Sequence, residues 1–139
     1  MEEAQKPDYG HWTVEQDFNV EDYLGFVYRI DDTVTNRFYI GKKLFFSKVK
    51  KKPLKGKTRA RRSIKESDWK TYTSSSNEIN SIIEKDGKSR FKFTILSCHK
   101  SKSMINYTEL YHQIMHDVLR NPNAINGIIN IRLSKIKEE

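Results

Sequence analysis

Cysteine and long apolar runs are nearly absent from this sequence of 139 residues. Its single cysteine, Cys98, excludes an intramolecular disulfide framework and disfavours a zinc site built from cysteines. A reducing, cytoplasmic compartment is therefore expected. No stretch approaches the roughly 18 apolar residues that a membrane span needs, and the acidic first ten residues lack the apolar core of a secretory signal. We therefore expect no membrane partner.

Acidic residues are missing from one long segment. Residues 42–65 carry twelve of the 26 basic residues and no Asp or Glu. Residues 1–36, by contrast, hold nine acids and two bases, a net charge of −7. Because the whole chain has a net charge of +8, residues 37–139 carry +15. A basic domain of this kind indicates a polyanionic partner, with nucleic acid ahead of an acidic membrane.

The apolar pattern predicts one α+β domain with a small, mostly antiparallel sheet flanked by helices. The expected strands are 24–31, 37–41, 90–97 and 127–133, and the expected helices are 77–85 and 104–119. The second helix should bury a stripe formed by Tyr107, Leu110, Tyr111, Ile114, Val118 and Leu119. We place the domain at residues 24–139, after an irregular acidic arm over 1–23 that Tyr9, Trp12, Phe18 and Tyr23 could anchor. Within it, residues 42–65 form a basic insertion, which Pro53 and Gly56 predict to be an extended loop with a short helix near 60–66.

The predicted N-terminal hairpin carries the most specific motif. Gly25-Phe26-Val27-Tyr28 is followed, after ten intervening residues, by Tyr39-Ile40-Gly41. This pair resembles the two motifs that open the GIY-YIG nuclease domain, although the first departs mildly from Gly-Ile-Tyr. A basic residue, a helical glutamate (Glu109) and a late asparagine (Asn130) follow in the family's order. Tyr-Ile-Gly-Lys-Lys and Glu-Ser-Asp-Trp-Lys also look like small phage-encoded members, which act in the host cytoplasm.

The resemblance implies a metal-dependent DNA endonuclease that leaves 5′-phosphate and 3′-hydroxyl ends. Tyr28 would be the general base, with a pKa lowered by Lys42, Lys43 and a metal, and Tyr39 would orient the water or a phosphate oxygen. Glu109 would hold Mg²⁺, or Mn²⁺ in its place, and His112 would touch metal-bound water or phosphate.

The resemblance also implies a phosphate-binding arginine and a supporting asparagine. Arg61 is the first choice for the arginine, with Arg59 and Arg62 as alternatives, and Asn130 is the asparagine, with Asn126 as its alternative. The residues expected to bind DNA are Lys42, Lys43, Lys50, Lys51, Lys52, Arg59 and Arg62. Targeting would come from the basic segment, the arm, a homodimer or an accessory protein.

Several alternatives remain open at this point. Asn106 and Glu109 have the spacing of a capping box, which would make the glutamate structural. His112 and His116 are four residues apart and could share a zinc ion. The chain could also be a non-catalytic nucleic-acid-binding module on a nuclease-like fold, or an inhibitor or assembly factor that uses its acidic arm.

Overall fold

The fold is described from a computed structural model that covers residues 7–59 and 61–136, with the backbone alone for residues 49–51, 61 and 62. The strands are β1 (Trp12–Thr13), β2 (Gly25–Asp32), β3 (Phe38–Leu44), β4 (Phe46–Lys51), β5 (Arg61–Glu66) and β6 (Phe91–His99). The α-helices are α1 (Asn77–Asp86) and α2 (Lys102–Met115). Short 3-10 helices span Val20–Asp22, Trp69–Thr71 and Lys88–Arg90.

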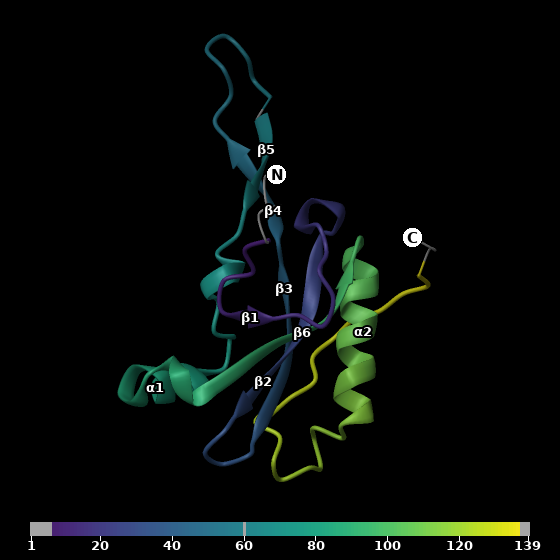
Figure 1. Ribbon diagram of the computed structural model, residues 1–139. Coiled ribbons are helices and arrows are strands. Elements are labelled where there is room, and N and C mark those ends of the chain that lie inside the picture. The colour runs from purple at the N-terminus through teal and green to yellow at the C-terminus, as the bar shows by residue number, and fades with distance from the viewer. Residues whose placement is uncertain (1–6, 60, 137–139) are drawn as a thin grey trace, which may run out of the picture.

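Strands β1, β6, β2 and β3 form the central sheet, in that order (Figure 1). β1 runs parallel to β6, whereas β2 is antiparallel to both β6 and β3. The predicted α+β domain with a small, mostly antiparallel sheet is confirmed. The β2–β3 turn closes because the Asp32 carboxylate accepts hydrogen bonds from the backbone of Val34 and Thr35. Asn36, a residue that tolerates the left-handed region, adopts a φ of 60° there.

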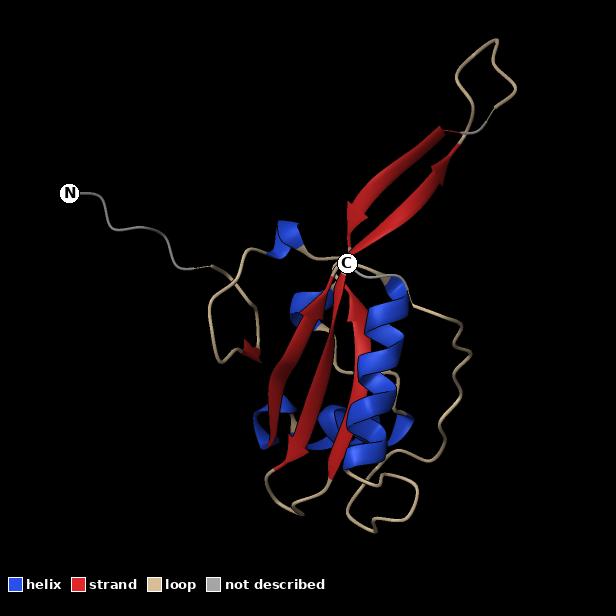
Figure 2. Ribbon diagram, turned by 90° about the vertical axis from the view of Figure 1, so that its right-hand side faces the viewer, coloured by secondary structure: helices blue, strands red, loops and turns tan. Residues whose placement is uncertain are grey.

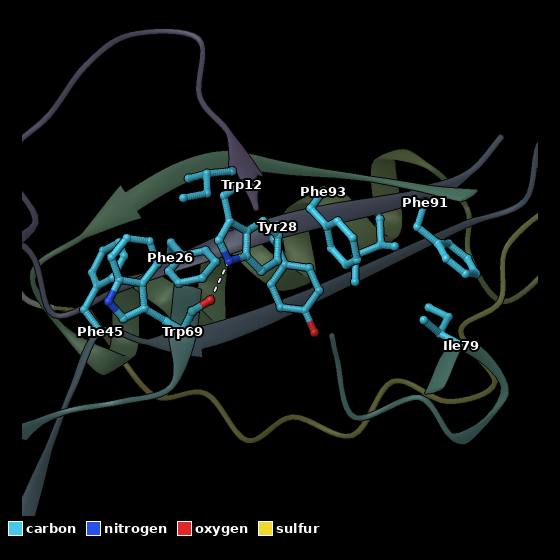
Figure 3. Close-up of a cluster of buried hydrophobic side chains, with 10 residues drawn as sticks. Trp12, Phe26, Tyr28, Phe45, Trp69, Ile79, Phe91 and Phe93 are labelled. Atoms are coloured by element: carbon cyan, nitrogen blue, oxygen red, sulfur yellow. Dashed lines mark hydrogen bonds between the residues drawn. The ribbon is translucent and has the colours of Figure 1, made fainter. Parts of the chain in front are cut away.

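The sheet buries a different core on each face. One face carries the aromatic cluster of Figure 3, which includes Trp12, Phe26, Tyr28, Phe45, Trp69, Phe91 and Phe93. The other face packs against α2 through Val27, Ile40 and Ile105. Figure 2 shows α2 lying along this face. The two cores fix β2 and β3, and with them the tyrosine motifs.

Helix α2 begins earlier and is rotated relative to the sequence-based expectation. Ser101 caps it by accepting a hydrogen bond from the Met104 N–H, so Asn106 is not its N-cap. The buried residues of α2 are Ile105 and Gln113. Most of the predicted apolar stripe was wrong, because Tyr107, Tyr111, Ile114 and Leu119 are more than half exposed. Val118, in contrast, is buried as predicted.

The basic insertion is a β-hairpin rather than a loop with a short helix. β4 and β5 pair antiparallel, from Phe46 opposite Glu66 to Lys51 opposite Arg61. Pro53 and Gly56 do interrupt regular structure, but they lie in the loop that joins the strands. The hairpin extends away from the central sheet (Figure 2). Sequence analysis missed it because its strands lack a clear apolar face.

The two ends of the chain compare differently with expectation. The N-terminal segment is anchored through Trp12, as expected, since Trp12 is 5% exposed and its indole N–H donates to the Trp69 carbonyl. Residues 127–133 form no strand within the described part of the chain. The edge of β3 is occupied just before them, where Phe38 exchanges backbone hydrogen bonds with Asn123 and Ile125. Among the described residues, no helix is both long and apolar enough to cross a membrane.

Candidate active site

The two motif tyrosines lie on one face of the β2–β3 hairpin. Tyr28 is opposite Gly41 and Tyr39 is opposite Ile30, so the tyrosines are diagonal neighbours. Their ring centroids are 6.2 Å apart. A β-carbon added at Gly41 would lie 2.5 Å from Tyr28 Cζ and 3.0 Å from Tyr39 Cε1. The glycine of the second motif is therefore required because the Tyr28 phenol crosses β3 at this position.

Tyr72, which precedes α1, joins the two motif tyrosines. Its ring centroid is 6.2 Å from that of Tyr28, in an edge-to-face arrangement. Lys43 Nζ lies 4.1 Å from the centroid of the Tyr72 ring and 2.8 Å from the Asp68 carboxylate. Tyr39 shares a 3.2 Å hydrogen bond with Ser75. The segment after β5 thus closes over the hairpin face.

The pKa of Tyr28 moves opposite to the sequence-based expectation. Burial is the main cause that raises this pKa well above 10, and Tyr39, Tyr72 and the negative charge of Glu109 add to the rise. Burial also raises the pKa of Tyr39, against the hydrogen bond from Ser75. Lys43 does not lower the pKa of Tyr28, since its ammonium pairs with Asp68. In the protein alone Tyr28 is therefore a neutral phenol.

Glu109 reaches this cluster from α2. It lies in the middle of the helix, so the capping-box alternative is wrong. Its side chain is 14% exposed, and a carboxylate oxygen is 3.8 Å from Lys42 Nζ. Burial raises the pKa of Glu109, and Lys42 opposes the rise. The negative charge of Glu109 also acts on both motif tyrosines, since it raises the pKa of Tyr28 and that of Tyr39.

The chemistry of Glu109 fits a hard divalent cation. The described residues contain no group of three or more His, Cys, Asp or Glu side chains that could enclose a metal ion. This finding does not support a zinc site at His112 and His116. Mg²⁺ differs from zinc because it keeps several waters and is often held by one or two carboxylates with substrate phosphates. A single half-buried carboxylate therefore suits Mg²⁺ better than zinc.

His112 lies one turn beyond Glu109 and is half-buried. Burial lowers its pKa, and His116 and His99 lower it further. Its backbone carbonyl is 2.7 Å from His116 Nδ1, which ties the two histidines to the end of the helix. His112 is therefore predominantly neutral at pH 7, and its contact with metal-bound water or phosphate stays a prediction.

Asn126, rather than Asn130, supports the tyrosine hairpin. The Asn126 side chain accepts a 3.0 Å hydrogen bond from the Ile40 N–H and donates a 2.8 Å hydrogen bond to the Ile40 carbonyl. This amide therefore holds the residue between Tyr39 and Gly41 as a neighbouring strand would. Asn130 is exposed four residues later. The Asn126-Gly127 pair was the available signal, and it was the alternative choice.

The backbone of the arginines chosen from the sequence lies at the outer end of the β4–β5 hairpin or in the loop beyond it. The backbone of Arg61 is opposite Lys51 and that of Arg62 is opposite Lys50, at the outer end of the β4–β5 hairpin. Five residue steps along β4 span about 17 Å, so the backbone of Arg61 lies far from the base of the hairpin. The side chains of these four residues are outside the described part of the structure. Lys52 and Arg59 are exposed in the connecting loop.

Lysines lie much closer to the site. A cleft of about 770 Å³ opens between β3, the base of the β4–β5 hairpin and the start of α2. Its basic lining residues are Lys42, Lys43, Lys65 and Lys102. Lys42 both lines the cleft and pairs with Glu109, so the cleft adjoins the carboxylate and the tyrosines. Among the described side chains, Lys42 and Lys43 therefore place positive charge beside Glu109 and Tyr72.

A protein-family model described as "Putative endonuclease segE, GIY-YIG domain" matches residues 12–129. The chain belongs to this GIY-YIG family. The match includes both tyrosine motifs, Glu109 and Asn126, and it begins at the first residue of β1. No curated protein and no solved structure matched the chain. The GIY-YIG assignment confirms the resemblance read from the hairpin and identifies a nuclease-family domain whose substrate class is DNA.

Proposed function

We propose that this GIY-YIG protein is a metal-dependent DNA endonuclease that hydrolyses a phosphodiester bond to a 5′-phosphate and a 3′-hydroxyl. One observation carries the proposal: the two motif tyrosines lie together on the β2–β3 hairpin, and α2 supplies a largely buried carboxylate, Glu109, whose charge acts on both of them. A half-buried carboxylate next to two phenols weakens binding of a phosphate, because it repels the anion. A cation bound to Glu109 would balance this negative charge and so allow a phosphate to bind beside the phenols.

Glu109 would hold the metal ion in this proposal, with Mg²⁺ as the expected ion and Mn²⁺ as a substitute. When bound, the ion would supply Lewis acidity toward the phosphate and positive charge beside the phenols. Lys42 now lies 3.8 Å from the carboxylate that the cation would use. The Lys42 ammonium, which also donates to Asn106 Oδ1, would then have a donor to spare for a phosphate oxygen.

Tyr28 and Tyr39 would position the attacking water. As a neutral phenol, Tyr28 can donate a hydrogen bond to the water or accept one from it, and Tyr39 can do the same for a phosphate oxygen. Tyr28 can serve as the general base only after it loses its own proton, since the phenolate is the basic form. The raised pKa of Tyr28 therefore predicts that nicking accelerates as the pH rises through the alkaline range.

The lysines of the cleft would contact the DNA backbone around the scissile phosphate. Lys43 is held between Asp68 and the Tyr72 ring, so its ammonium is fixed close to the phenols. Neutralisation of phosphate by lysine is independent of base sequence. This part of the site therefore supports cleavage without specifying where the protein cuts.

Nicking of supercoiled plasmid tests the proposal. Purified protein should nick plasmid with Mg²⁺ or Mn²⁺ and not with EDTA, and DNA ligase should reseal the nicks without prior end repair. Tyr28→Phe and Tyr39→Phe should each lose most of the nicking activity. Tyr107→Phe is the matched control, because Tyr107 is 51% exposed on α2. DNA binding without metal-dependent nicking would instead favour the non-catalytic binding module.

A further inference from the structure

The β4–β5 hairpin is a ribbon with almost no packing of its own. Within the described residues, β4 and β5 form a separate two-stranded sheet and pair with each other alone. Ile64, an apolar residue in the middle of β5, is 72% exposed. A two-stranded hairpin of this kind contributes little to stability. Packing against the hydrophobic core therefore does not explain why the hairpin is so long.

The base of the ribbon, in contrast, is fixed to the body. Phe46 packs against the aromatic core. Ser67 donates its N–H to the Phe45 carbonyl at 2.8 Å, and its hydroxyl donates to the Leu44 carbonyl. The Glu66 carboxylate accepts a 3.0 Å hydrogen bond from the Trp69 indole. The ribbon thus leaves the domain in a defined direction, away from the sheet (Figure 2).

Basic residues occupy both sets of register positions along the ribbon. Successive pairs in an antiparallel ladder belong to opposite faces. One set pairs Lys48 with Ile64 and Lys50 with Arg62, and the other pairs Ser47 with Lys65 and Lys51 with Arg61. Each set therefore contains three basic residues. The connecting loop adds exposed Lys52, Lys55, Lys57 and Arg59, and Glu66 at the base is the acidic residue of the ribbon.

A basic ribbon has two ways to contact a duplex. A ribbon that lies flat across one phosphate backbone needs cations on one face. A ribbon that enters a groove has a phosphate backbone on each side and needs cations on both. The major groove of B-form DNA is about 12 Å wide and accepts a two-stranded ribbon. With its faces toward the two backbones, the ribbon would occupy about 10 Å of this width, the distance at which sheets pack face to face.

Resting on the proposed function for its DNA substrate, we infer that the β4–β5 hairpin inserts into the major groove of duplex DNA. Lys65 belongs to one face of the ribbon and also lines the cleft next to Lys42 and Lys43. A phosphate backbone that borders the groove on that face therefore leads toward Glu109. The ribbon fixes the duplex from the groove while the tyrosine site faces an adjoining phosphate.

Duplex RNA gives a test of groove insertion, because the major groove of its A-form helix is deep and narrow. Binding is measured by fluorescence anisotropy with DNA and RNA duplexes of equal length and sequence, in EDTA so that no cleavage occurs. The full chain should bind DNA more tightly than RNA by about tenfold or more, since the ribbon adds groove contacts only in DNA.

A shortened ribbon should remove this preference. Residues 48–64 are replaced by Asn-Gly, a pair that favours a tight hairpin turn, because Ser47 and Lys65 are directly paired. The shortened protein should bind both duplexes more weakly and within about twofold of each other, because only phosphate contacts remain. A shortened protein that keeps the full preference for DNA would overturn the inference, as would equal binding of the two duplexes by the full chain.

Single substitutions test the two faces without altering the backbone. Lys48→Gln and Lys65→Gln remove one exposed cation from each face and should each reduce the salt dependence of log K by about one unit. Lys85→Gln, in the last turn of α1, is the control and should leave the slope unchanged. An effect from one face alone would contradict insertion and indicate a ribbon lying flat.

The nuclease activity is scored separately. At low salt the shortened protein should still nick plasmid with Mg²⁺, since its deletion spares Tyr28, Tyr39 and Glu109. If the shortened protein nicks plasmid and still prefers DNA over RNA as strongly as the full chain does, the groove insertion of the ribbon is refuted and the proposed nuclease function stands. Lack of nicking by the full chain, together with the expected change in preference, refutes the proposed function and leaves the ribbon as a DNA-binding element.

Discussion

Gly41→Ala should damage the candidate active site without removing any of its polar groups. A β-carbon at position 41 would lie 2.5 Å from Tyr28 Cζ, whereas carbon atoms in contact prefer about 3.5 Å or more. The Tyr28 phenol, or the strand beneath it, must therefore move by about 1 Å. A displacement of this size can reduce catalysis by about 10²-fold, and overpacking costs about 1–3 kcal/mol of folding stability.

The measurements are plasmid nicking under single-turnover conditions and thermal unfolding. Gly127→Ala is the matched control, because its new β-carbon would have no heavy atom within 4 Å. We expect nicking by Gly41→Ala to fall by about 10²-fold while DNA binding in EDTA is retained. Wild-type nicking by a folded Gly41→Ala protein would show that the position of the Tyr28 phenol over β3 does not matter.

Two further predictions concern stability. Asn126→Ala removes the side-chain partner of the buried Ile40 N–H and leaves Gln113 as the side-chain donor to the Ile40 carbonyl. It should lower the free energy of unfolding by about 1–3 kcal/mol in urea titrations. Asn130→Ala, at an exposed position, should change it little, and equal effects would reject the role of Asn126. Burial, with Lys88 nearby, lowers the pKa of His11 to about 4. The contribution of neutral His11 to the free energy of unfolding should therefore be fully present above pH 6.5, where the imidazole is neutral in the unfolded chain too. This contribution should be lost as the pH drops toward 4. We expect His11→Gln to reduce this loss by about 1–2 kcal/mol after allowance for solvent screening, and an unchanged pH dependence would show that His11 does not couple to folding.

Local patterns predicted the N-terminal hairpin and α1 well. Tyr28 and Tyr39 lie on adjacent strands as the paired motifs required, because the turn residues between them leave one compact way to pair. The helix 77–85 was predicted with its end at Asp86-Gly87, and Gly87 does follow it with a φ of 84°. In both cases the deciding interactions are local in sequence.

Long-range packing explains what the sequence did not reveal. The rotation of α2 depends on Ile105 and on the bond from Gln113 to the Ile40 carbonyl, so the apolar stripe around Tyr111 was misleading. The raised pKa of Tyr28 depends on burial by side chains distant in sequence. The β4–β5 ribbon has no buried face, so no apolar alternation marked it. Arg61 was chosen by order along the chain, which does not report where a hairpin points.

The Mg²⁺ dependence of nicking by Glu109→Gln tests the central claim most directly. Gln preserves the shape of Glu109 and suits a helix interior, so the melting temperature should shift by no more than about 2–4 °C. Glu84→Gln, an exposed position on α1, is the control. We predict that Glu109→Gln loses nicking by about 10³-fold at every Mg²⁺ concentration and binds DNA in EDTA at least as tightly as the wild type, since a repulsive charge is gone. Nicking at the wild-type rate across the titration would contradict the proposal that Glu109 holds the metal ion.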